Sequence, residues 1–257
     1  MKRELPVDIT VIKADLHEIL SLRQLFLQEN NFQIRYDACH ERHWADTYLL
    51  VLDGIEVGYG AVKGKDALKD RDAVFECYVL PAYRKWSSEL FAALIQISGA
   101  RYIECQTNDA FMTALLYEFA RNVYSDTVLF AESMTTTFLQ PGVLFRRRKE
   151  DDDVFGKSRD DAGQYVLEKK GEIVADGGFL THYNLPFADL YMEVKPECRE
   201  RGLGTFMLQE VKKECYRAGR VPAARCNMNN RASKATLIKA GFRVCGFMLC
   251  GEVKREG

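Results

Sequence analysis

The chain has 257 residues, of which 47% are apolar and 28% are charged, and its formal net charge is -1. This length suits one large globular domain or two smaller ones, and the apolar fraction excludes general disorder. A net charge so close to zero gives no basic field for nucleic-acid phosphates or anionic lipid headgroups, so neither nucleic acid nor a membrane is expected as a partner.

The N-terminus and the cysteines predict a cytoplasmic protein. The first residues, MKRELPVDITVIK, contain no apolar stretch of signal-peptide length, and no segment approaches the roughly 20 apolar residues of a membrane span. The eight cysteines include no C-x-x-C pair, which is typical of free thiols in a reducing compartment. His40 and His43 have a helical spacing but no second pair of ligands, so no metal is expected.

The first part of the chain predicts a strand, two helices and a hairpin. Residues 8–13 (DITVIK) have strand character, and residues 14–31 carry an apolar helical stripe with room for two helices before Thr47. Residues 47–64 (TYLLVLDGIEVGYGAVKG) predict a hairpin that turns at Asp53-Gly54. A strand, a helix, a strand and a second helix follow, and the strand TTTFL ends this part before the break at Gln140-Pro141-Gly142.

The second part of the chain repeats this order without the early helices. Residues 164–180 (QYVLEKKGEIVADGGFL) resemble the first hairpin and turn at Lys170-Gly171. The run from Val194 to Arg199 aligns with the run from Val79 to Arg84, and each precedes a helical pattern. We therefore expect two lobes, residues 1–140 and residues 141–257, built as strand-strand-strand-helix-strand-helix-strand.

The stretch RERGLGTF, residues 199–206, joins a strand end to a helical pattern. Such a turn presents backbone N–H groups at the positive end of the helix dipole, which suits a phosphate or pyrophosphate. Gly202 and Gly204 allow close approach of the anion, Thr205 adds a hydroxyl, and Arg199 and Arg201 add positive charge. No Gly-Lys-Ser/Thr sequence and no third glycine follow, so the turn is neither a Walker A loop nor a dinucleotide-binding loop.

The order Arg-x-x-Gly-x-Gly after a V-x-P strand end resembles the cofactor loop of the GNAT family of N-acetyltransferases. The N-x-x-S helix start at Asn230, the K-A-G-F helix end at residues 239–242 and the strand RVCGFML extend the resemblance over residues 163–250. The resemblance implies an α/β (α+β) fold with mixed, mostly antiparallel sheets flanked by helices. It also implies acetyl-CoA as cosubstrate, held where the strands DLYMEVK and PAARCNM splay apart. The residues implied in cofactor binding are Met192, Glu193, Val194, Arg199, Glu200, Arg201, Gly202, Leu203, Gly204, Thr205, Asn230 and Ser233, although helix capping alone also explains the last two.

Acyl transfer to an amine needs a base for the amine proton and a thiolate that can leave. Glu193 lies on the polar face of DLYMEVK, which the resemblance places beside the thioester, and we predict that it is the general base; an exposed salt-bridge carboxylate is the alternative. His182 and Tyr183 are candidates for acceptor binding or proton relay, with a structural turn as the alternative. Many GNAT relatives place an acidic tyrosine seven residues after the asparagine, where this chain has Leu237.

The first lobe lacks the features of the cofactor loop. At the position of RERGLGTF it has RKWSSEL, in which Ser87 and Glu89 replace the two glycines and bring a carboxylate to the pyrophosphate position. We therefore expect a degenerate GNAT-like first lobe and acetyl-CoA in the second lobe only. The predicted function is N-acetylation of a primary amine on a small-molecule acceptor by a monomer or homodimer. The alternatives are a non-catalytic acyl-CoA sensor and a protein N-acetyltransferase.

Overall fold

The computed structural model describes residues 7–33 and 36–254, and these residues form two compact units. Neither unit is continuous in the sequence. Unit 1 contains residues 7–32, 36–125 and 247–254, and unit 2 contains residue 33 and residues 126–246. The expected lobes, residues 1–140 and residues 141–257, follow the sequence repeats and not these units. The division into those two lobes stays a prediction.

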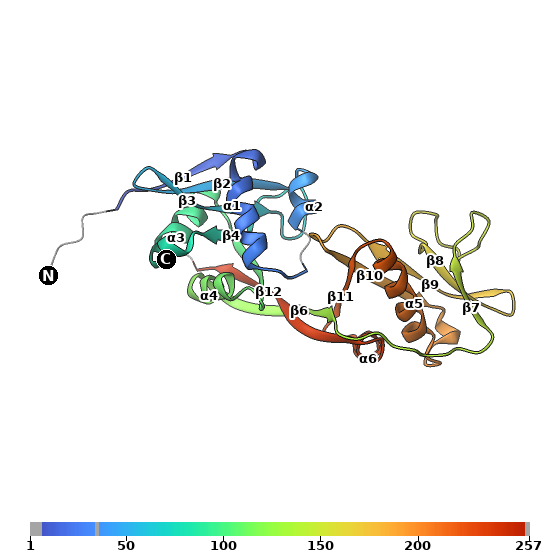
Figure 1. The fold of residues 1–257 in the computed structure, drawn as a ribbon. Coiled ribbons are helices and arrows are strands. Elements are labelled where there is room, and N and C mark those ends of the chain that lie inside the picture. The colour runs from blue at the N-terminus through green and yellow to red at the C-terminus, as the bar shows by residue number, and fades with distance from the viewer. Residues whose placement is uncertain (1–6, 34–35, 255–257) are drawn as a thin grey trace. The chain divides into compact units, whose positions relative to one another are not determined.

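Unit 1 has the element order predicted for the first repeat, including the two early helices (Figure 1). Its elements are β1 (Ile9–Ala14), α1 (Leu16–Glu29), α2 (Tyr36–Glu41), β2 (Ala45–Leu52), β3 (Ile55–Lys63), β4 (Ala73–Val79), the 3-10 helix η1 (Pro81–Trp86), α3 (Ser87–Ser98), β5 (Tyr102–Gln106) and α4 (Ala110–Phe119).

Unit 2 repeats the order from the hairpin onward. Residues 148–164, between its first two strands, form neither helix nor strand, so α1 and α2 have no counterpart there, as predicted. Its elements are β7 (Val143–Arg147), β8 (Tyr165–Lys169), β9 (Glu172–Leu180), β10 (Phe187–Val194), the 3-10 helix η2 (Pro196–Cys198), α5 (Leu203–Arg217), β11 (Val221–Asn227) and α6 (Arg231–Lys239).

Two long strands, β6 (Ala120–Glu132) and β12 (Phe242–Val253), each begin in one unit and end in the other. Residues 248–252 of β12 pair with β5 in unit 1. Residues 127–131 of β6 pair with β11 in unit 2. Each unit therefore takes one strand of its sheet from the other repeat, an exchange that the sequence did not predict.

The strands follow the order β1-β2-β3-β4-β5-β12-β6-β11-β10-β9-β8-β7. The pairs β4–β5 and β10–β11 are parallel, whereas the other pairs with an assigned register are antiparallel. This mixed, mostly antiparallel sheet with flanking helices confirms the predicted fold class. Both predicted hairpin turns are also present, with positive φ at Asp53 (49°) and Gly54 (78°) and at Lys170 (52°) and Gly171 (81°), as in type I′ turns.

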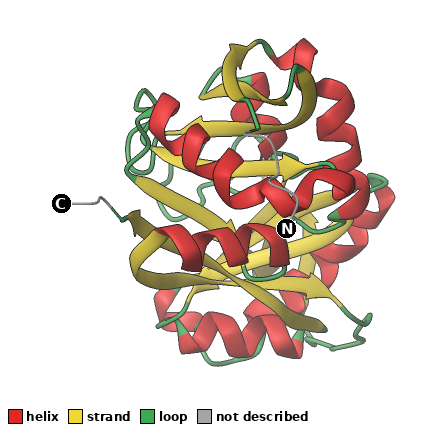
Figure 2. Cartoon of the chain, turned by 90° about the vertical axis from the view of Figure 1, so that its left-hand side faces the viewer, coloured by secondary structure: helices red, strands yellow, loops and turns green. Residues whose placement is uncertain are grey.

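Helices cover both faces of the sheet in unit 1 (Figure 2). The ring of Phe26 in α1 packs edge-on against Tyr59 of β3, with ring centroids 6.3 Å apart. The next residue, Gly60, faces α3, because a Cβ there would lie 2.3 Å from Leu94 Cδ2. Successive strand residues point to opposite faces, so α1 and α3 lie on opposite sides of the sheet.

One face of the sheet in unit 2 is covered by α5, and the other is covered by residues 148–164. A Cβ at Gly177 of β9 would lie 3.1 Å from Met207 Cε of α5. The preceding residue, Asp176, points to the other face and contacts Lys157 at 2.9 Å. The loop therefore occupies the side of the sheet that α1 covers in unit 1, because Tyr59 and Asp176 are equivalent in the aligned hairpins.

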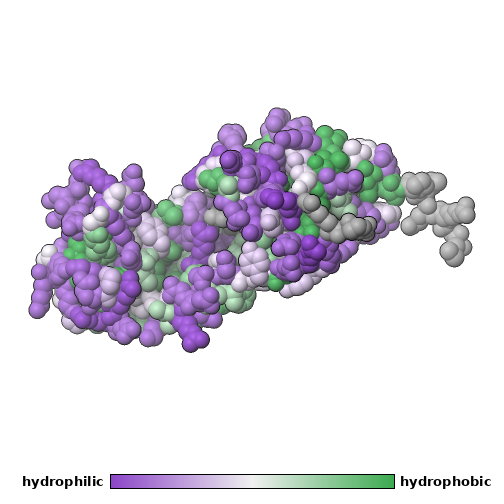
Figure 3. Space-filling model, turned by 180° about the vertical axis from the view of Figure 1, so that it is seen from behind, coloured by the Kyte–Doolittle hydropathy of each residue, from purple (hydrophilic) through white to green (hydrophobic). Residues whose placement is uncertain are grey.

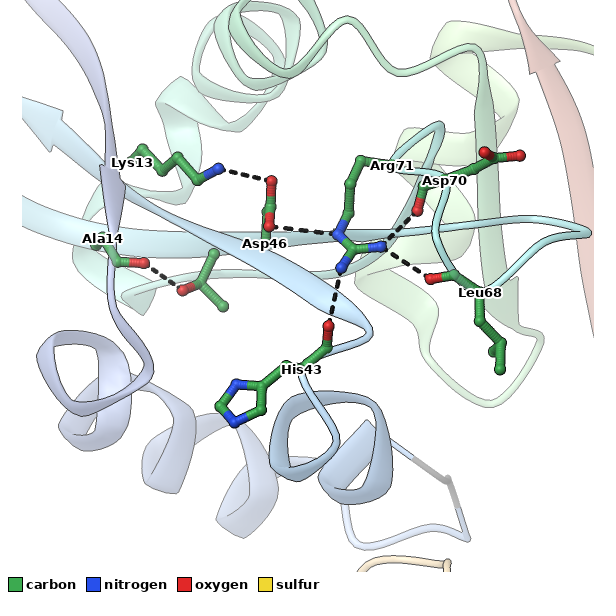
Figure 4. Close-up of polar contacts among 8 residues, drawn as sticks. Lys13, Ala14, His43, Asp46, Leu68, Asp70 and Arg71 are labelled. Carbon is green, nitrogen blue, oxygen red and sulfur yellow. Dashed lines mark hydrogen bonds and ion pairs between the residues drawn. The ribbon is translucent and has the colours of Figure 1, made fainter.

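An ion network holds the edge of unit 1 together (Figure 4). Asp46 of β2 accepts hydrogen bonds from Lys13 Nζ at 2.7 Å and from Arg71 Nε at 3.3 Å. Arg71 also donates to the carbonyl oxygen of His43 at 2.9 Å, which ties the loop before β4 to the turn after α2. Burial would raise the pKa of Asp46, but the two cations outweigh it and lower this pKa. These contacts have a structural role.

On the face of the molecule shown in Figure 3, hydrophilic residues predominate and hydrophobic residues form smaller separate areas. None of the helices in the described part of the chain is long and apolar enough to cross a membrane.

The segment TTTFL is not a strand, so that prediction was wrong. β6 ends at Glu132, and residues 133–140 follow without regular structure. The side chain of Gln209 in α5 pairs with this segment instead: its Oε1 accepts from Phe138 N at 2.6 Å, and its Nε2 donates to Phe138 O at 3.1 Å. A side-chain amide thus bonds both backbone groups of Phe138, in a segment that the sequence predicted as a strand.

Helix α4 begins at a buried aspartate whose charge destabilises the fold. Asp109 is 4% exposed, and its Oδ1 accepts from Met112 N at 3.0 Å as the helix N-cap. Burial, aided by the charge of Glu76 and opposed by backbone N–H donors, raises the pKa of Asp109 to about 6. Because this pKa exceeds that of an unfolded aspartate, ionisation of Asp109 lowers stability as the pH rises from about 4 to about 6.

We predict that Asp109→Asn raises the free energy of unfolding by about 1–2 kcal/mol at pH 7.5. Asparagine caps a helix as well as aspartate does but has no charge to bury. The gain should shrink toward zero near pH 3, below the ordinary aspartate pKa of about 3.9, where Asp109 is largely protonated even in the unfolded chain. Urea unfolding at both pH values measures the difference, and equal stabilities at pH 7.5 would contradict the prediction.

Candidate functional site

The parallel strands β10 and β11 separate partway along their length. They pair from Phe187 to Asp189 on β10 and from Val221 to Ala223 on β11, and no paired positions follow. Residues 190–194 of β10 keep antiparallel partners on β9 only. This is the splay that the resemblance implied, and it exposes the edge of β10 that carries Met192 and Val194. β4 and β5 pair in parallel at only two positions, so unit 1 has the same opening.

The glycine turn lies at the start of α5, directly after the splayed strand. Gly202 is the N-cap residue with φ of 78°, and the helical hydrogen bonds begin with Phe206 N donating to Gly202 O at 3.1 Å. The N–H groups of residues 203–205 precede that bond, as they do at any helix start, and can bind an anion. Leu203, Gly204 and Thr205 are buried, which fixes the position of this turn.

Both glycines are needed where they stand, for different reasons. A Cβ at Gly204 would lie 3.0 Å from Met192 Cε and 3.1 Å from Thr236 Cγ2, so a side chain there would require these two closely packed side chains to shift. A Cβ at Gly202 would meet Gln140 Nε2 at 2.8 Å, the end of an exposed side chain that can move. Gly202 is therefore required by its positive φ and by the open space beside the helix start.

Arg199 holds the turn to the strand. Its Nε donates to Val194 O at 3.1 Å. The equivalent Arg84 in unit 1 donates its Nε to Val79 O at the same distance, 3.1 Å, although that turn has no glycines. This bond is therefore a feature of the turn in both repeats, and a role for Arg199 at the pyrophosphate stays a prediction.

The remaining charged residues of the turn are exposed. Glu200 has φ of 62°, a left-handed conformation that is uncommon for a glutamate and shapes the turn before Gly202. The carbonyl oxygen of Arg201 accepts a hydrogen bond from Gln140 Nε2 at 2.9 Å. Gln140 therefore lies at the candidate cofactor loop. The sequence had indicated only a boundary there.

Asn230 is the N-cap residue of α6, and its side chain accepts from Ser233 N at 3.0 Å. Asp109 makes the equivalent bond to Met112 N at 3.0 Å in unit 1. The capping interpretation of Asn230 is thus correct. The equivalent residue caps its helix even in the repeat that has no glycine turn. Contact of Asn230 and Ser233 with a cofactor stays a prediction.

Glu193 lies on the face of β10 opposite α5, in a cluster of three charged groups. Its Oε2 is 2.8 Å from Lys157 Nζ, and its side chain is 49% exposed. Lys157 Nζ also donates to Asp176 Oδ1 at 2.9 Å and Oδ2 at 3.0 Å. Asp176 is the cross-strand partner of Glu193 on β9, and its Oδ2 accepts from Gly163 N at 2.8 Å. The predicted base is both exposed and paired with a lysine.

Burial alone would lower the pKa of Lys157, but the hydrogen bonds to Glu193 and Asp176 outweigh burial and raise it above its ordinary value. Lys157 is therefore a stable cation at this site. Tyr191, on the same face of β10 as Glu193, has its pKa raised by burial and by the charge of Asp176. A neutral hydroxyl and one exposed carboxylate thus lie on the same strand face.

His182 and Tyr183 lie away from Glu193. His182 Nε2 is 3.0 Å from Asp189 Oδ2, which is also 3.3 Å from Arg225 Nε. Asp189 and Glu193 are four residues apart on one strand, or about 13 Å. Tyr183 is 4% exposed and packs edge-on against His182. The structure thus places these two candidates at the closed end of the splay, where the structural-turn alternative also fits.

Residues 129–242 match the family model described as "Acetyltransferase (GNAT) family". The chain contains a GNAT-family acetyltransferase domain. The matched residues fall within unit 2, the unit that contains the glycine turn. Among the curated proteins, none matched this chain.

Solved structures of low sequence identity show the same fold as the GNAT domain and the rest of the chain. An acetyltransferase of the GNAT family from Colwellia psychrerythraea has a TM-score of 0.74 at 17% identity, covering 96% of this chain and 100% of its own. A tandem GNAT protein from the clavulanic acid biosynthesis pathway has a TM-score of 0.60 at 11% identity, covering 97% and 100%. A GCN5-related N-acetyltransferase from Sphaerobacter thermophilus has a TM-score of 0.58 at 15% identity, covering 99% and 98%.

Several residues of the GNAT domain site were not predicted from the sequence. Asp176 precedes two glycines within an apolar strand, and a charged residue in such a run was a usable signal. Lys157 lies in a charged loop among several other lysines and arginines, so no local pattern distinguished it. Gln140 depends on its contact with Arg201, 61 residues away, and Asp189 depends on contacts with His182 on the preceding turn and with Arg225 on β11.

Proposed function

We propose that unit 2 transfers an acetyl group from acetyl-CoA to the primary amine of a small-molecule acceptor. The observation that carries this proposal is the glycine turn at the start of α5, placed directly after a strand that separates from its parallel neighbour and carries an exposed carboxylate. An anion-binding helix start suits the pyrophosphate, and the unpaired edge of β10 suits an extended arm. Gly202 and Gly204 leave the space that side chains would fill.

Acetyl-CoA, when bound, supplies an activated thioester whose carbonyl carbon accepts the amine nitrogen as the carbon–sulfur bond breaks. Glu193 accepts the amine proton, directly or through a water, because its carboxylate is exposed on the strand face beside the splay. The backbone of β10 beyond the splay offers an N–H donor for the developing oxyanion. Leu237 is buried in α6 and donates no proton, so the thiolate is protonated by solvent.

The proposal assigns the cofactor to unit 2 alone and treats the first repeat as a degenerate GNAT lobe. Unit 1 has the same splay between β4 and β5, but Ser87 and Glu89 stand at the start of α3 where unit 2 has glycines. A carboxylate at a helix start repels a pyrophosphate. The tandem arrangement in the solved tandem GNAT protein supports this interpretation of the two repeats.

A non-catalytic acyl-CoA sensor is the second candidate function. The ion pair between Lys157 and Glu193 favours it, because a carboxylate held by a lysine also suits a purely structural role. Thiol release from acetyl-CoA, followed over a panel of small primary amines, separates the two functions. Amine-dependent release above the hydrolysis background is the result we expect. Tight acetyl-CoA binding by calorimetry without release for any amine would favour the sensor.

A further inference from the structure

We propose that Lys157 is a positioning residue, which holds the Glu193 side chain in place and favours its charged form against the charge of the buried Asp176. The inference rests on the proposed function, because it assigns Lys157 a role through Glu193. Lys157 Nζ contacts Glu193 at 2.8 Å and Asp176 at 2.9 and 3.0 Å. One ammonium thus links two carboxylates on neighbouring strands.

The loop that carries Lys157 is built to hold it in place. Val154 is 2% exposed and anchors the loop in unit 2, and Lys157 N donates to Val154 O at 3.0 Å. Phe155 and Gly156 between them have φ of 57° and 68°, which turns the chain back toward the sheet. Gly156 N donates to Asp153 Oδ1 at 2.9 Å. Lys157 therefore belongs to an ordered turn rather than to a mobile surface.

The first repeat also pairs a carboxylate of its central strands with a cation, but with different residues. Glu76 of β4, equivalent to Tyr191, is fully buried. Arg23 of α1 lies 3.3 Å from its carboxylate, and His40 of α2 lies 2.6 Å from it. In both repeats, the segment on this side of the sheet supplies a cation to a carboxylate of the central strands. Unit 2 lacks the two helices, and Lys157 of the loop supplies the cation there.

The charges around Glu193 explain why the cation matters. Asp176 faces it from β9, Lys157 faces it from the loop, and on its own strand face Tyr191 precedes it and Lys195 follows. Lys195 is held by Glu172 and Glu197 and does not neutralise Asp176. Without Lys157, Glu193 would oppose a buried carboxylate across the strand pair, and like charges at that spacing disfavour ionisation. Lys157 also restrains the Glu193 side chain, since one of its oxygens accepts from the ammonium.

The test compares Lys157→Gln and Lys157→Met with the wild type, and Lys157→Arg as rescue. Gln retains hydrogen bonding without charge, which keeps the test usable where Met fails to fold. In the profile of kcat/KM against pH, we expect the acidic limb to move up by about one pH unit in Lys157→Gln and Lys157→Met. In Lys157→Arg the acidic limb should stay near its wild-type position. With one acceptor throughout, the titration of the amine itself is constant. Lys213→Met, at an exposed surface pair on α5, is the control that should change nothing.

Carboxyl-carbon NMR gives a second measurement that does not depend on turnover. The Glu193 signal, assigned by its loss in Glu193→Gln, should titrate about one pH unit higher in Lys157→Gln than in the wild type. An unchanged midpoint in a folded Lys157→Gln protein would overturn the role of Lys157. A shifted midpoint in a protein that turns over no amine would support the role of Lys157 while refuting the proposed enzyme.

Discussion

Gly202→Leu is expected to weaken acetyl-CoA binding by at least about 100-fold, which corresponds to about 2.7 kcal/mol. A leucine at the N-cap of α5 fills the space in front of the N–H groups of residues 203–205 and blocks a pyrophosphate from them. The fold should tolerate the change, because the atom that its Cβ meets is the end of the exposed Gln140 side chain, 2.8 Å away. Calorimetry with acetyl-CoA measures the loss directly.

Gly219→Leu is the matched control for this variant. Gly219 follows α5 with φ of 71°, close to the 78° of Gly202, and no atom lies within 4 Å of a Cβ placed there. Both variants therefore carry the same backbone strain, on the order of 1–2 kcal/mol. Only Gly202→Leu should lose the cofactor. Wild-type affinity in Gly202→Leu, or an equal loss in Gly219→Leu, would contradict the assignment of the glycine turn.

Much of the fold could be predicted because it depends on local patterns. The two hairpin turns follow from Asp53-Gly54 and Lys170-Gly171, and the splay was implied by the resemblance to the GNAT family. The exchange of β6 and β12 could not be predicted, because each repeat ends in a strand that could have closed its own sheet. The partner of a strand depends on which edge it meets in three dimensions, and the segment TTTFL meets the Gln209 side chain instead of a sheet edge.

The candidate site likewise contains residues that could be predicted from the sequence and residues that could not. Gly202 and the N-cap Asn230 are visible in sequence because a positive φ and a helix start favour those residue types, and Gly204 is visible because it belongs to the same short glycine turn. Lys157 is not visible, because its role depends on contacts with Glu193 and Asp176 on strands that follow it in the sequence. The pairing of His182 with Asp189 is likewise a tertiary contact. A residue's partners, unlike its conformation, leave no short-range pattern.

Glu193→Gln is expected to lower kcat by about 100-fold or more while leaving the dissociation constant of acetyl-CoA near the wild-type value. Glutamine keeps the shape of the side chain and an oxygen that can accept from Lys157, so the loop and the strand pair stay in place. It cannot take a proton from the amine. Steady-state turnover together with calorimetry separates the loss of chemistry from any loss of binding.

The decisive comparison for Glu193→Gln is with Glu172→Gln and Asp176→Asn. Glu172 lies on β9 in an exposed pair with Lys195, so its variant should keep wild-type kcat. Asp176 is 1% exposed, and its oxygens accept from Lys157 and from Gly163 N, so it has little access to an acceptor amine. Asp176→Asn should therefore reduce stability more than Glu193→Gln does and reduce kcat less. The opposite ranking would indicate that Asp176, and not Glu193, is the general base. Full turnover in both variants would indicate that water accepts the amine proton without either carboxylate.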